Sequence, residues 1–281
     1  MRGYRQKSRR QPCVSPPAQH DRSRIAPAQC QDRSYAAAQH DQVHAPLGSQ
    51  FCQTWRAPGA PDGSVKFPVR RSKGFESMAS SLDGSKLYAL LEGALWDDAA
   101  KGYENEGGKP YLRVLEFDVK QQAWTGRHWK YVLEGAGHAI GDFNMIDAAT
   151  GLIIERDNGE GSPDQACPTG QKRPDCFDDV AKFKRVYKVE LSDANAGGPL
   201  RKIGYIDLLR IADPGKLARK PLTDGVLAFP FFTIENVDVV DVTHIVVGND
   251  NNLPFSSSRE PNKADDNELV LLEVGEFLKA R

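Results

Sequence analysis

Carboxylate, guanidinium and amide side chains crowd the end of one short hydrophobic run. In the segment GLIIERDNGEG, residues 151–161, the aliphatic stretch leads directly into Glu155, Arg156, Asp157 and Asn158. Side chains of these types can bind a cation, neutralise an anion or transfer a proton, so they could form a reaction centre. The same sequence also suits a plain turn, because Asn, Asp and Gly tolerate left-handed backbone conformations.

The pattern recurs elsewhere in the chain, and this recurrence favours the first interpretation. Each copy begins with a strand that carries Glu or Asn, turns, continues as an aliphatic strand and ends in acidic or amide residues. The three copies are GFESMASSLDGSKLYALLEG (74–93), GDFNMIDAATGLIIERDNG (141–159) and TIENVDVVDVTHIVVGNDNN (233–252). We expect them to be one supersecondary unit used three times.

Further strand-like runs follow each unit and define the expected architecture. Four strands are predicted in 74–133 and four in 141–209, whereas the third unit gains only one more strand, from NELVLLEVGEFL (267–278). Repeated four-stranded antiparallel units predict an all-β fold, a partial or incomplete β-propeller, with a β-sandwich of the same meanders as the alternative. A closed propeller needs about four blades or more, so we expect a fragment of a longer propeller whose exposed edges promote self-association.

Equivalent positions of successive blades meet near the central channel of a propeller, and this predicts a metal site. The expected ligands are the polar residues at such positions: Glu76, Asn144, Glu235, Asn249 and Asp250. Packed carboxylates repel one another unless a cation neutralises them, and an all-oxygen ligand set favours calcium over softer metals. One acidic residue at a strand end is more often a solvated turn residue, so the prediction rests on the recurrence.

The beginning of the chain differs in composition from the rest. Residues 1–73 hold 13 Lys or Arg against 4 Asp or Glu, although the whole chain has a net charge of −1. Residues 1–60 are rich in Gln, Ser, Pro and Ala without periodicity, so we expect a disordered segment before a folded domain at 61–281. The arginines lack interleaved aromatic residues, which argues against nucleic-acid binding. We expect neither a signal peptide nor a membrane span, because no suitable apolar run occurs.

Two cysteines occupy a short polar loop, ACPTGQKRPDC. We expect Cys167 and Cys176 to form a disulfide, with free thiols as the alternative, and a disulfide would place the protein in an oxidising compartment. No second Cys or His pair lies nearby in the sequence, which argues against a zinc site.

Several motifs taken together resemble the esterase-like phytase family. They are KGFESMASSLDGSKLYALLEGALWD, YLRVLEFD, GDFNMID, LIIERDNGEG, FPFFTIENVDVVD and HIVVGNDNNLPFSSSR, and the resemblance covers residues 61–281. The resemblance implies a secreted or periplasmic β-propeller and a hydrolase that acts on phosphate or other small-molecule esters.

Hydrolysis of such an ester needs cationic groups beside the reacting phosphoryl oxygens and a base that activates water. Arg156 and Arg259 are the candidate cations, and Glu155, Asp157 and His138 are the candidate bases. A divalent cation would polarise the ester and lower the pKa of bound water. Arg156 could equally hold its turn, and a lone histidine such as His138 is more often structural.

Two rival functions stay open on the sequence alone. One is a non-catalytic propeller in which calcium stabilises the fold or the surface binds a partner, and the other is a propeller lactonase. No G-x-S-x-G motif and no phosphate-binding glycine-rich nucleotide loop occurs, so neither a serine esterase of the α/β-hydrolase type nor a nucleotide site is expected.

Overall fold

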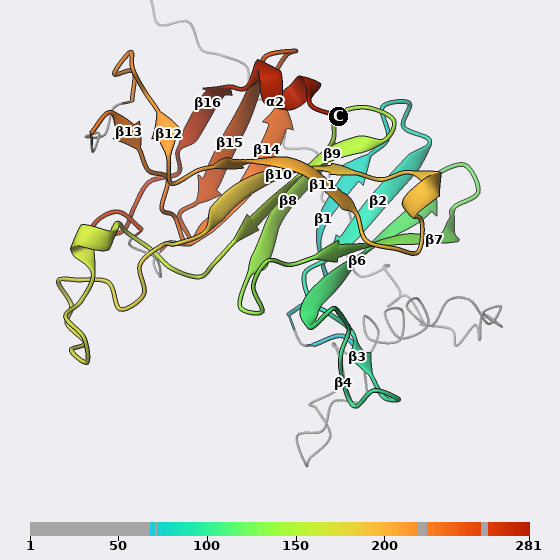
Figure 1. The fold of residues 1–281 in the computed structure, drawn as a ribbon, viewed down its shortest axis with the longest axis horizontal. Helices are drawn as coiled ribbons and strands as arrows, with labels where there is room; N and C mark the ends of the chain where they lie inside the picture. Colours follow the sequence, from blue (N-terminus) through green and yellow to red (C-terminus); the bar gives the residue numbers. More distant parts are fainter. Residues whose placement is uncertain (1–67, 71, 219–223, 254–257) are drawn as a thin grey trace, which may run out of the picture. The chain divides into compact units, whose positions relative to one another are not determined.

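The computed structural model describes residues 68–70, 72–218, 224–253 and 258–281, which form antiparallel β-sheets joined in sequence order (Figure 1). All of them belong to the second of two compact units, Ala38–Arg281. The expected disordered segment, residues 1–60, lies outside the described residues.

Three sheets carry most of the described chain. Sheet 1 is built from β1 (Phe75–Ser80), β2 (Lys86–Leu91), β6 (Lys109–Asp118) and β7 (Ala123–Val132), with β5 (Asn105–Glu106) paired to β6. Sheet 2 is built from β8 (Ala139–Met145), β9 (Thr150–Arg156), β10 (Lys184–Glu190) and β11 (Arg201–Asp207). Sheet 3 is built from β14 (Thr233–Val239), β15 (His244–Asp250) and β16 (Leu269–Glu273).

Short elements fill the connections between these strands. Two-stranded ribbons are formed by β3 (Trp96–Asp97) with β4 (Gly102–Tyr103) and by β12 (Ile211–Ala212) with β13 (Val226–Leu227). Single 3-10 turns occur at Pro163–Gln165 and Asp193–Asn195. The predicted all-β fold of several antiparallel sheets is therefore confirmed. Sheet 1 has five strands and not the predicted four, the described residues form no closed ring, and the propeller stays a prediction.

The first strands of the three sheets lie side by side. Ser77 on β1 donates through Oγ to the carbonyl of Gly141 on β8 at 3.3 Å, and Asn144 on β8 donates through Nδ2 to the carbonyl of Val237 on β14 at 2.7 Å. A Cβ at Gly141 would lie 1.8 Å from the carbonyl oxygen of Ile234, so only glycine permits this approach of β8 to β14. Residues far apart in the sequence are thus brought together along these strands.

The strand registers correct the sequence alignment of the three units. A β-bulge follows Phe75 in β1, Ile140 in β8 and Ile234 in β14, which makes Glu76 and Glu235 structurally equivalent. The unpaired residues at the corresponding bulge of sheet 2 are Gly141 and Asp142, whereas Asn144 pairs with Leu152 and lies outside this bulge. A bulge inserts an unpaired residue into a strand, and the sequence pattern gives no sign of its place.

Strand β9 lies between two neighbouring sheets. All seven of its residues are buried, although a half-buried strand would alternate buried and exposed positions. Ile153 packs in a core with Trp129 of sheet 1, whereas Ile154 packs in a second core with Val247 of sheet 3. Coverage of both faces accounts for the uninterrupted aliphatic run of β9, Leu152 to Ile154.

The last segment of the chain differs from its prediction as one long strand. Strand β16 ends at Glu273, and a short helix α2 (Gly275–Lys279) follows. Phe277 and Leu278 pack against the core between sheets 2 and 3. The Nζ of Lys188 donates to the carbonyl of Leu278 and, at 2.9 Å, to that of Ala280, which satisfies acceptors at the end of the helix.

The outer face of sheet 3 exposes two leucines. Leu269 and Leu271 on β16 keep 71% and 61% of their surface accessible. Self-association through exposed sheet edges stays a prediction. No helix in the described part of the chain is long and apolar enough to cross a membrane.

Candidate functional site

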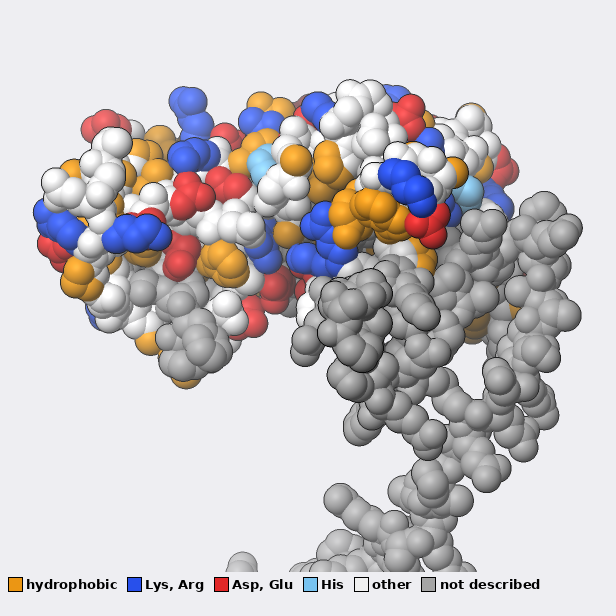
Figure 2. Space-filling model, turned by 90° about the horizontal axis from the view of Figure 1, so that it is seen from below, with side chains coloured by type: hydrophobic (Ala, Val, Ile, Leu, Met, Phe, Trp, Pro, Cys, Tyr) orange, Lys and Arg blue, Asp and Glu red, His pale blue; other side chains and the backbone are white. Residues whose placement is uncertain are grey.

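A cavity of about 700 Å³ opens beside the ends of β9 and the loop before β8. The polar and charged residues of its wall that matter for chemistry are Arg70, Lys73, Glu92, His138, Arg156 and Asn158. On the face shown in Figure 2, basic and acidic side chains of the described residues are interspersed with hydrophobic ones. Three cationic side chains, those of Arg70, Lys73 and Arg156, line the cavity together with one carboxylate, Glu92.

Arg156 is the most deeply buried cation of the cavity wall. Its residue surface is 6% accessible, its Nη1 donates to Asn158 Oδ1 at 2.9 Å, and its Nη2 lies 4.0 Å from Glu235 Oε1. The buried Nε has no hydrogen-bond partner among the described residues. The guanidinium also lies over the ring of Phe232, 5.2 Å from the centroid. A buried donor without a partner is costly, so Arg156 has donor capacity for an additional group.

Carboxylates of sheets 1 and 3 interact electrostatically with this arginine. Burial lowers the pKa of Arg156, and the opposing effect of Glu235, Glu92 and Glu76 does not fully compensate. Burial likewise raises the pKa of Glu76 and of Glu235, with the neighbouring carboxylates adding to the increase. Glu92 is paired with Lys73, whose Nζ lies 2.6 Å from its Oε1. Arginine and lysine side chains therefore supply positive charge at the point where the strand ends converge.

The predicted metal ligands are not gathered in one cluster. Asn144 donates to the backbone of sheet 3, Asn249 contacts the backbone of Asp266 and Glu268, and Asp250 accepts from the N–H of Asn252. Within the described ranges, no group of three or more His, Cys, Asp or Glu side chains is placed to hold a metal ion. The five predicted ligands therefore do not share one site, and calcium binding by a subset such as Glu76 and Glu235 stays a prediction.

His138 lines the cavity and is held by a carboxylate behind it. Its Nδ1 lies 2.8 Å from Oε1 of Glu155, and its ring packs on Phe183 with centroids 4.3 Å apart. A Cβ at position 135 would lie 2.7 Å from His138 Nε2, so Gly135 leaves the space that the imidazole occupies. The structure thus joins two of the three predicted bases into one pair.

Glu155 itself is fully buried at the interface of sheets 1 and 2. Besides His138, it accepts from the hydroxyl of Tyr131 at 2.8 Å, from the N–H of Glu134 at 2.6 Å and from the Nζ of Lys202 at 3.0 Å. Glu155 does not line the cavity, whereas the His138 that it contacts does. Glu155 is therefore poorly placed to contact a substrate directly.

Asp157, the third predicted base, holds the long connection from β9 to β10. Its Oδ2 accepts from the N–H groups of Lys182 and Phe183, at 2.8 and 2.9 Å, and its Oδ1 lies 2.9 Å from Nζ of the buried Lys184. Burial alone would raise the pKa of Asp157, but Lys184 and the backbone donors outweigh it and lower this pKa. Burial lowers the pKa of Lys184 to about 8. These contacts indicate a structural role for Asp157.

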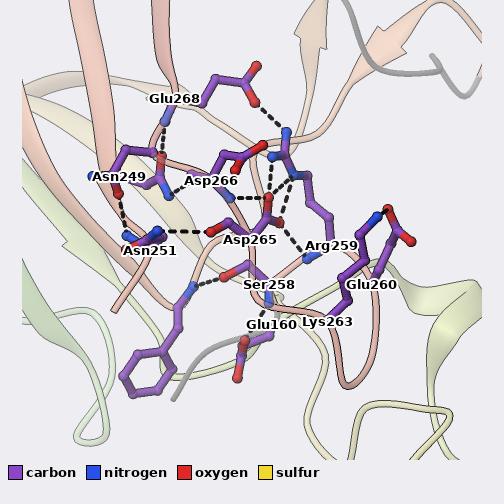
Figure 3. A network of polar contacts seen from close by, with 12 residues as sticks. Glu160, Asn249, Asn251, Ser258, Arg259, Glu260, Lys263, Asp265, Asp266 and Glu268 are labelled. Atoms are coloured by element: carbon purple, nitrogen blue, oxygen red, sulfur yellow. Dashed lines mark hydrogen bonds and ion pairs between the residues drawn. The ribbon is translucent and has the colours of Figure 1, made fainter. Parts of the chain in front are cut away.

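Arg259, the second predicted cation, lies in a separate network above sheet 3 (Figure 3). It pairs with Asp265, where Nε lies 2.8 Å from Oδ2, and with Glu268, and it stacks 4.7 Å above the ring of Phe231. Asp265 and Glu268 raise the pKa of Arg259 although burial opposes them. Asn249 joins the network by accepting from the N–H of Glu268 at 2.7 Å. The structure therefore separates Arg259 from Arg156.

Sequence reasoning missed the other cations near the site. Arg70 and Lys73 precede the first repeat and were counted with the basic beginning of the chain. Lys202 lies on β11, the outermost strand of sheet 2, where a lysine directly after Arg201 reads as a solvated surface residue. The position of Arg70 and Lys73 just before the first strand-rich segment was the only signal for those two residues.

The predicted disulfide is confirmed. Cys167 and Cys176 are bonded, with Cα atoms 4.9 Å apart, in the connection between β9 and β10. This connection contacts the Arg259 network, because Gln165 donates to the carbonyl of Arg259 at 2.7 Å and Asn262 donates to the carbonyl of Pro174. The bridge thus constrains a loop that packs on sheet 3.

Comparison with known proteins identifies a family. A family model described as phytase-like, esterase-like activity of phytase, matches residues 40–253. No curated protein matches the sequence. Among solved structures, the chain is similar to one titled crystal structure of RRP9 WD40 repeats, with 11% identity, 71% of this chain and 80% of that chain covered, and a TM-score of 0.25. The chain is also similar to a structure titled structure of U3-55K, with 9% identity, 71% of this chain and 80% of that chain covered, and a TM-score of 0.24. Neither superposition is close enough to support an argument about this chain.

Proposed function

This chain belongs to the phytase-like family, and from that premise we propose that it hydrolyses phosphate or related esters in the cavity lined by Arg156 and His138. The observation that carries the proposal is the unpartnered Nε of the buried Arg156, which lines the same cavity as Arg70 and Lys73. Two arginines, Arg70 and Arg156, beside the ion pair of Lys73 with Glu92 suit an anionic ester better than a neutral one. A buried guanidinium also binds phosphate oxygens through paired donors.

The proposed reaction is attack of water on the ester. The water oxygen bonds to phosphorus, one water proton passes to His138, and the ester oxygen departs with its electron pair and is protonated by solvent. Arg156, Arg70 and Lys73 balance the charge that accumulates on the phosphoryl oxygens. Proton transfer by a positioned histidine contributes roughly 100-fold or more to such reactions.

A panel of small aryl substrates tests the proposal. We expect the purified full chain to release inorganic phosphate from p-nitrophenyl phosphate, and Arg156→Met to lower kcat/KM by roughly 100-fold. Arg201→Met is the matched control, because Arg201 lies on β11 and pairs with Glu190. Equal rates for the two variants would contradict the assignment of Arg156.

The same panel distinguishes the rival functions. A preference for a simple lactone would favour a lactonase, and failure to turn over phosphate esters, carboxylic esters and lactones would overturn the hydrolase. A rise in thermal stability with calcium but without turnover would favour a non-catalytic calcium-binding module. The raised pKa values of Glu76 and Glu235 support testing calcium, because a cation would relieve their mutual repulsion.

Export from the cytoplasm is part of the proposal. It is supported by the Cys167–Cys176 disulfide, since such bonds persist in oxidising compartments. Fractionation of the native host, with the redox state of these cysteines measured by alkylation, tests it.

A further inference from the structure

We infer that Glu155 is a positioning residue, which holds the His138 imidazole with its proton on Nδ1 and so makes Nε2 the atom that accepts a proton. The inference rests on the proposed function in one respect, namely that His138 acts as the base. The assignment of the ring proton, however, follows from the hydrogen bonds of Glu155 and can be tested without any substrate.

Three of the four contacts of Glu155 are hydrogen bonds donated to it, and the fourth is the contact with His138. Oε1 receives the backbone N–H of Glu134 and faces Nδ1 of His138, while Oε2 receives the hydroxyl of Tyr131 and the ammonium of Lys202. The backbone N–H and the ammonium can only donate, so they require acceptor oxygens. Each of the two oxygens accepts at least one hydrogen bond, as expected for an ionised carboxylate. The His138 nitrogen that faces it must therefore carry hydrogen.

Tyr131 is also fixed as a donor in this arrangement. It is fully buried, and burial together with the neighbouring Glu155 raises its pKa well above the usual value. A neutral phenol whose oxygen lies 2.8 Å from a carboxylate oxygen donates its hydrogen. Apart from Nδ1 of His138, the groups that contact the carboxylate all donate to it, so none of them could accept a hydrogen from a protonated Glu155.

Other charged groups around the pair maintain this state. Lys202 Nζ lies 2.9 Å from Glu134 Oε1 and over the rings of Tyr131 and Tyr187, at 4.6 and 4.1 Å, and Glu134 is also paired with Lys109 at 2.9 Å. On the cavity side the charged residues that share the wall with His138 are Arg70, Lys73, Glu92 and Arg156. The excess of cations on both sides favours the ionised carboxylate.

Packing leaves the imidazole little freedom to exchange its two nitrogens. The ring lies between Phe183 and the backbone at Gly135, and Glu155 behind it is completely buried. Nε2 makes no hydrogen bond to any described residue. A histidine oriented by a carboxylate on one nitrogen and unpartnered on the other is suited to take a proton from water.

Nitrogen NMR of the wild-type chain tests the tautomer directly. At a pH where the ring is neutral, we expect the His138 signals, assigned by their loss in His138→Gln, to show a protonated Nδ1 and an unprotonated Nε2. The opposite pattern overturns the inference. This result does not depend on turnover, so it is separate from a failure of the proposed hydrolase, which would appear as absence of activity in the wild type.

Kinetics with Glu155→Gln tests the functional consequence. Loss of the negative charge behind the ring should lower kcat roughly 100-fold with little change in KM, and move the acid limb of the kcat/KM profile to lower pH. Glu190→Gln is the matched control, because Glu190 pairs with Arg201 on the outer strands. An unchanged pH profile in folded Glu155→Gln overturns the inference. If that variant does not fold, the wild-type tautomer decides the question.

Discussion

Arg156 and Arg259 follow the same kind of polar strand-end sequence, yet their surroundings differ. Arg259 is neutralised by Asp265 and Glu268 in one compact network, and these partners raise its pKa. Arg156 is more deeply buried, has a distant carboxylate partner at 4.0 Å and an Nε without a partner, and its pKa is lowered. The difference indicates that one arginine serves the fold, whereas the other has capacity for a ligand.

Substitution of Arg259 should give the largest change in the free energy of unfolding. Arg259→Met should lower the free energy of unfolding by about 3 kcal/mol, because it leaves Asp265 and Glu268 without their cation. Arg156→Met should lower it by roughly 1 kcal/mol or less, since Met avoids the desolvation of a poorly paired charge. Urea denaturation followed by circular dichroism measures both values. Equal losses would remove the distinction between the two arginines.

Loss of the disulfide beside the Arg259 network should give the second-largest decrease in the free energy of unfolding. Replacing both Cys167 and Cys176 with Ser should lower the free energy of unfolding by about 2.5 kcal/mol, because the unfolded chain gains the freedom of an open loop. Urea denaturation of the double variant and of the reduced wild type gives the value. Ester hydrolysis per folded molecule should stay unchanged, and a large loss of it would connect this loop to the cavity.

The carboxylates near the two arginines should respond to pH in opposite directions. Side-chain and backbone donors, above all Arg259, outweigh burial and lower the pKa of Asp265, so its stabilising contribution is present at neutral pH and is lost as the pH falls below the ordinary value of 3.8. Burial raises the pKa of Glu235, so its contribution is present in acid and is lost as the pH rises through the folded value.

Two isosteric variants measure this contrast. At pH 7, Asp265→Asn should destabilise the protein by roughly 1.5 kcal/mol, as expected for a lost hydrogen bond to a charged group, and Glu235→Gln should stabilise it slightly. Below pH 4 both differences should shrink. The comparison fails if Glu235→Gln is the more destabilising variant at neutral pH.

Calcium binding should give the smallest of these changes in stability. If Glu76 and Glu235 bind calcium beside Arg156, the ion stabilises the chain by roughly 0.4 kcal/mol at a concentration equal to Kd, seen as a higher melting temperature than in chelator. The double variant Glu76→Gln with Glu235→Gln should abolish the shift, whereas Asp265→Asn should retain it. Identical melting curves of the wild type with calcium and with chelator would exclude the calcium site.

Much of the fold was predictable because the strand signals are local. The repeated pairs of strands, the hairpin turns and the antiparallel order follow from alternation and turn residues at short range. The bulge in β8 was not predictable, so Asn144 was aligned with Glu76 and Glu235 although the bulge of β8 lies at Gly141 and Asp142. The helical end of the chain was also missed, because Phe277 and Leu278 continue the apolar pattern of β16.

The candidate site was predictable in part. Glu155, Arg156 and His138 were singled out from residue type and position, and the structure brings His138 to Glu155 and into the same cavity wall as Arg156. Arg70, Lys73 and Lys202 were missed because each comes from a segment that is remote in sequence. Arg259 was included because its sequence context resembles that of Arg156.

The sequence by itself determined the strands, their antiparallel order and the crowding of charged groups at the strand ends. Only the tertiary structure decided which charges are paired, because pairing depends on distance and burial between residues up to about a hundred positions apart. Desolvation makes an unpaired buried donor costly, while a nearby carboxylate removes that cost. For this physical reason two similar arginines, Arg156 and Arg259, acquire different properties.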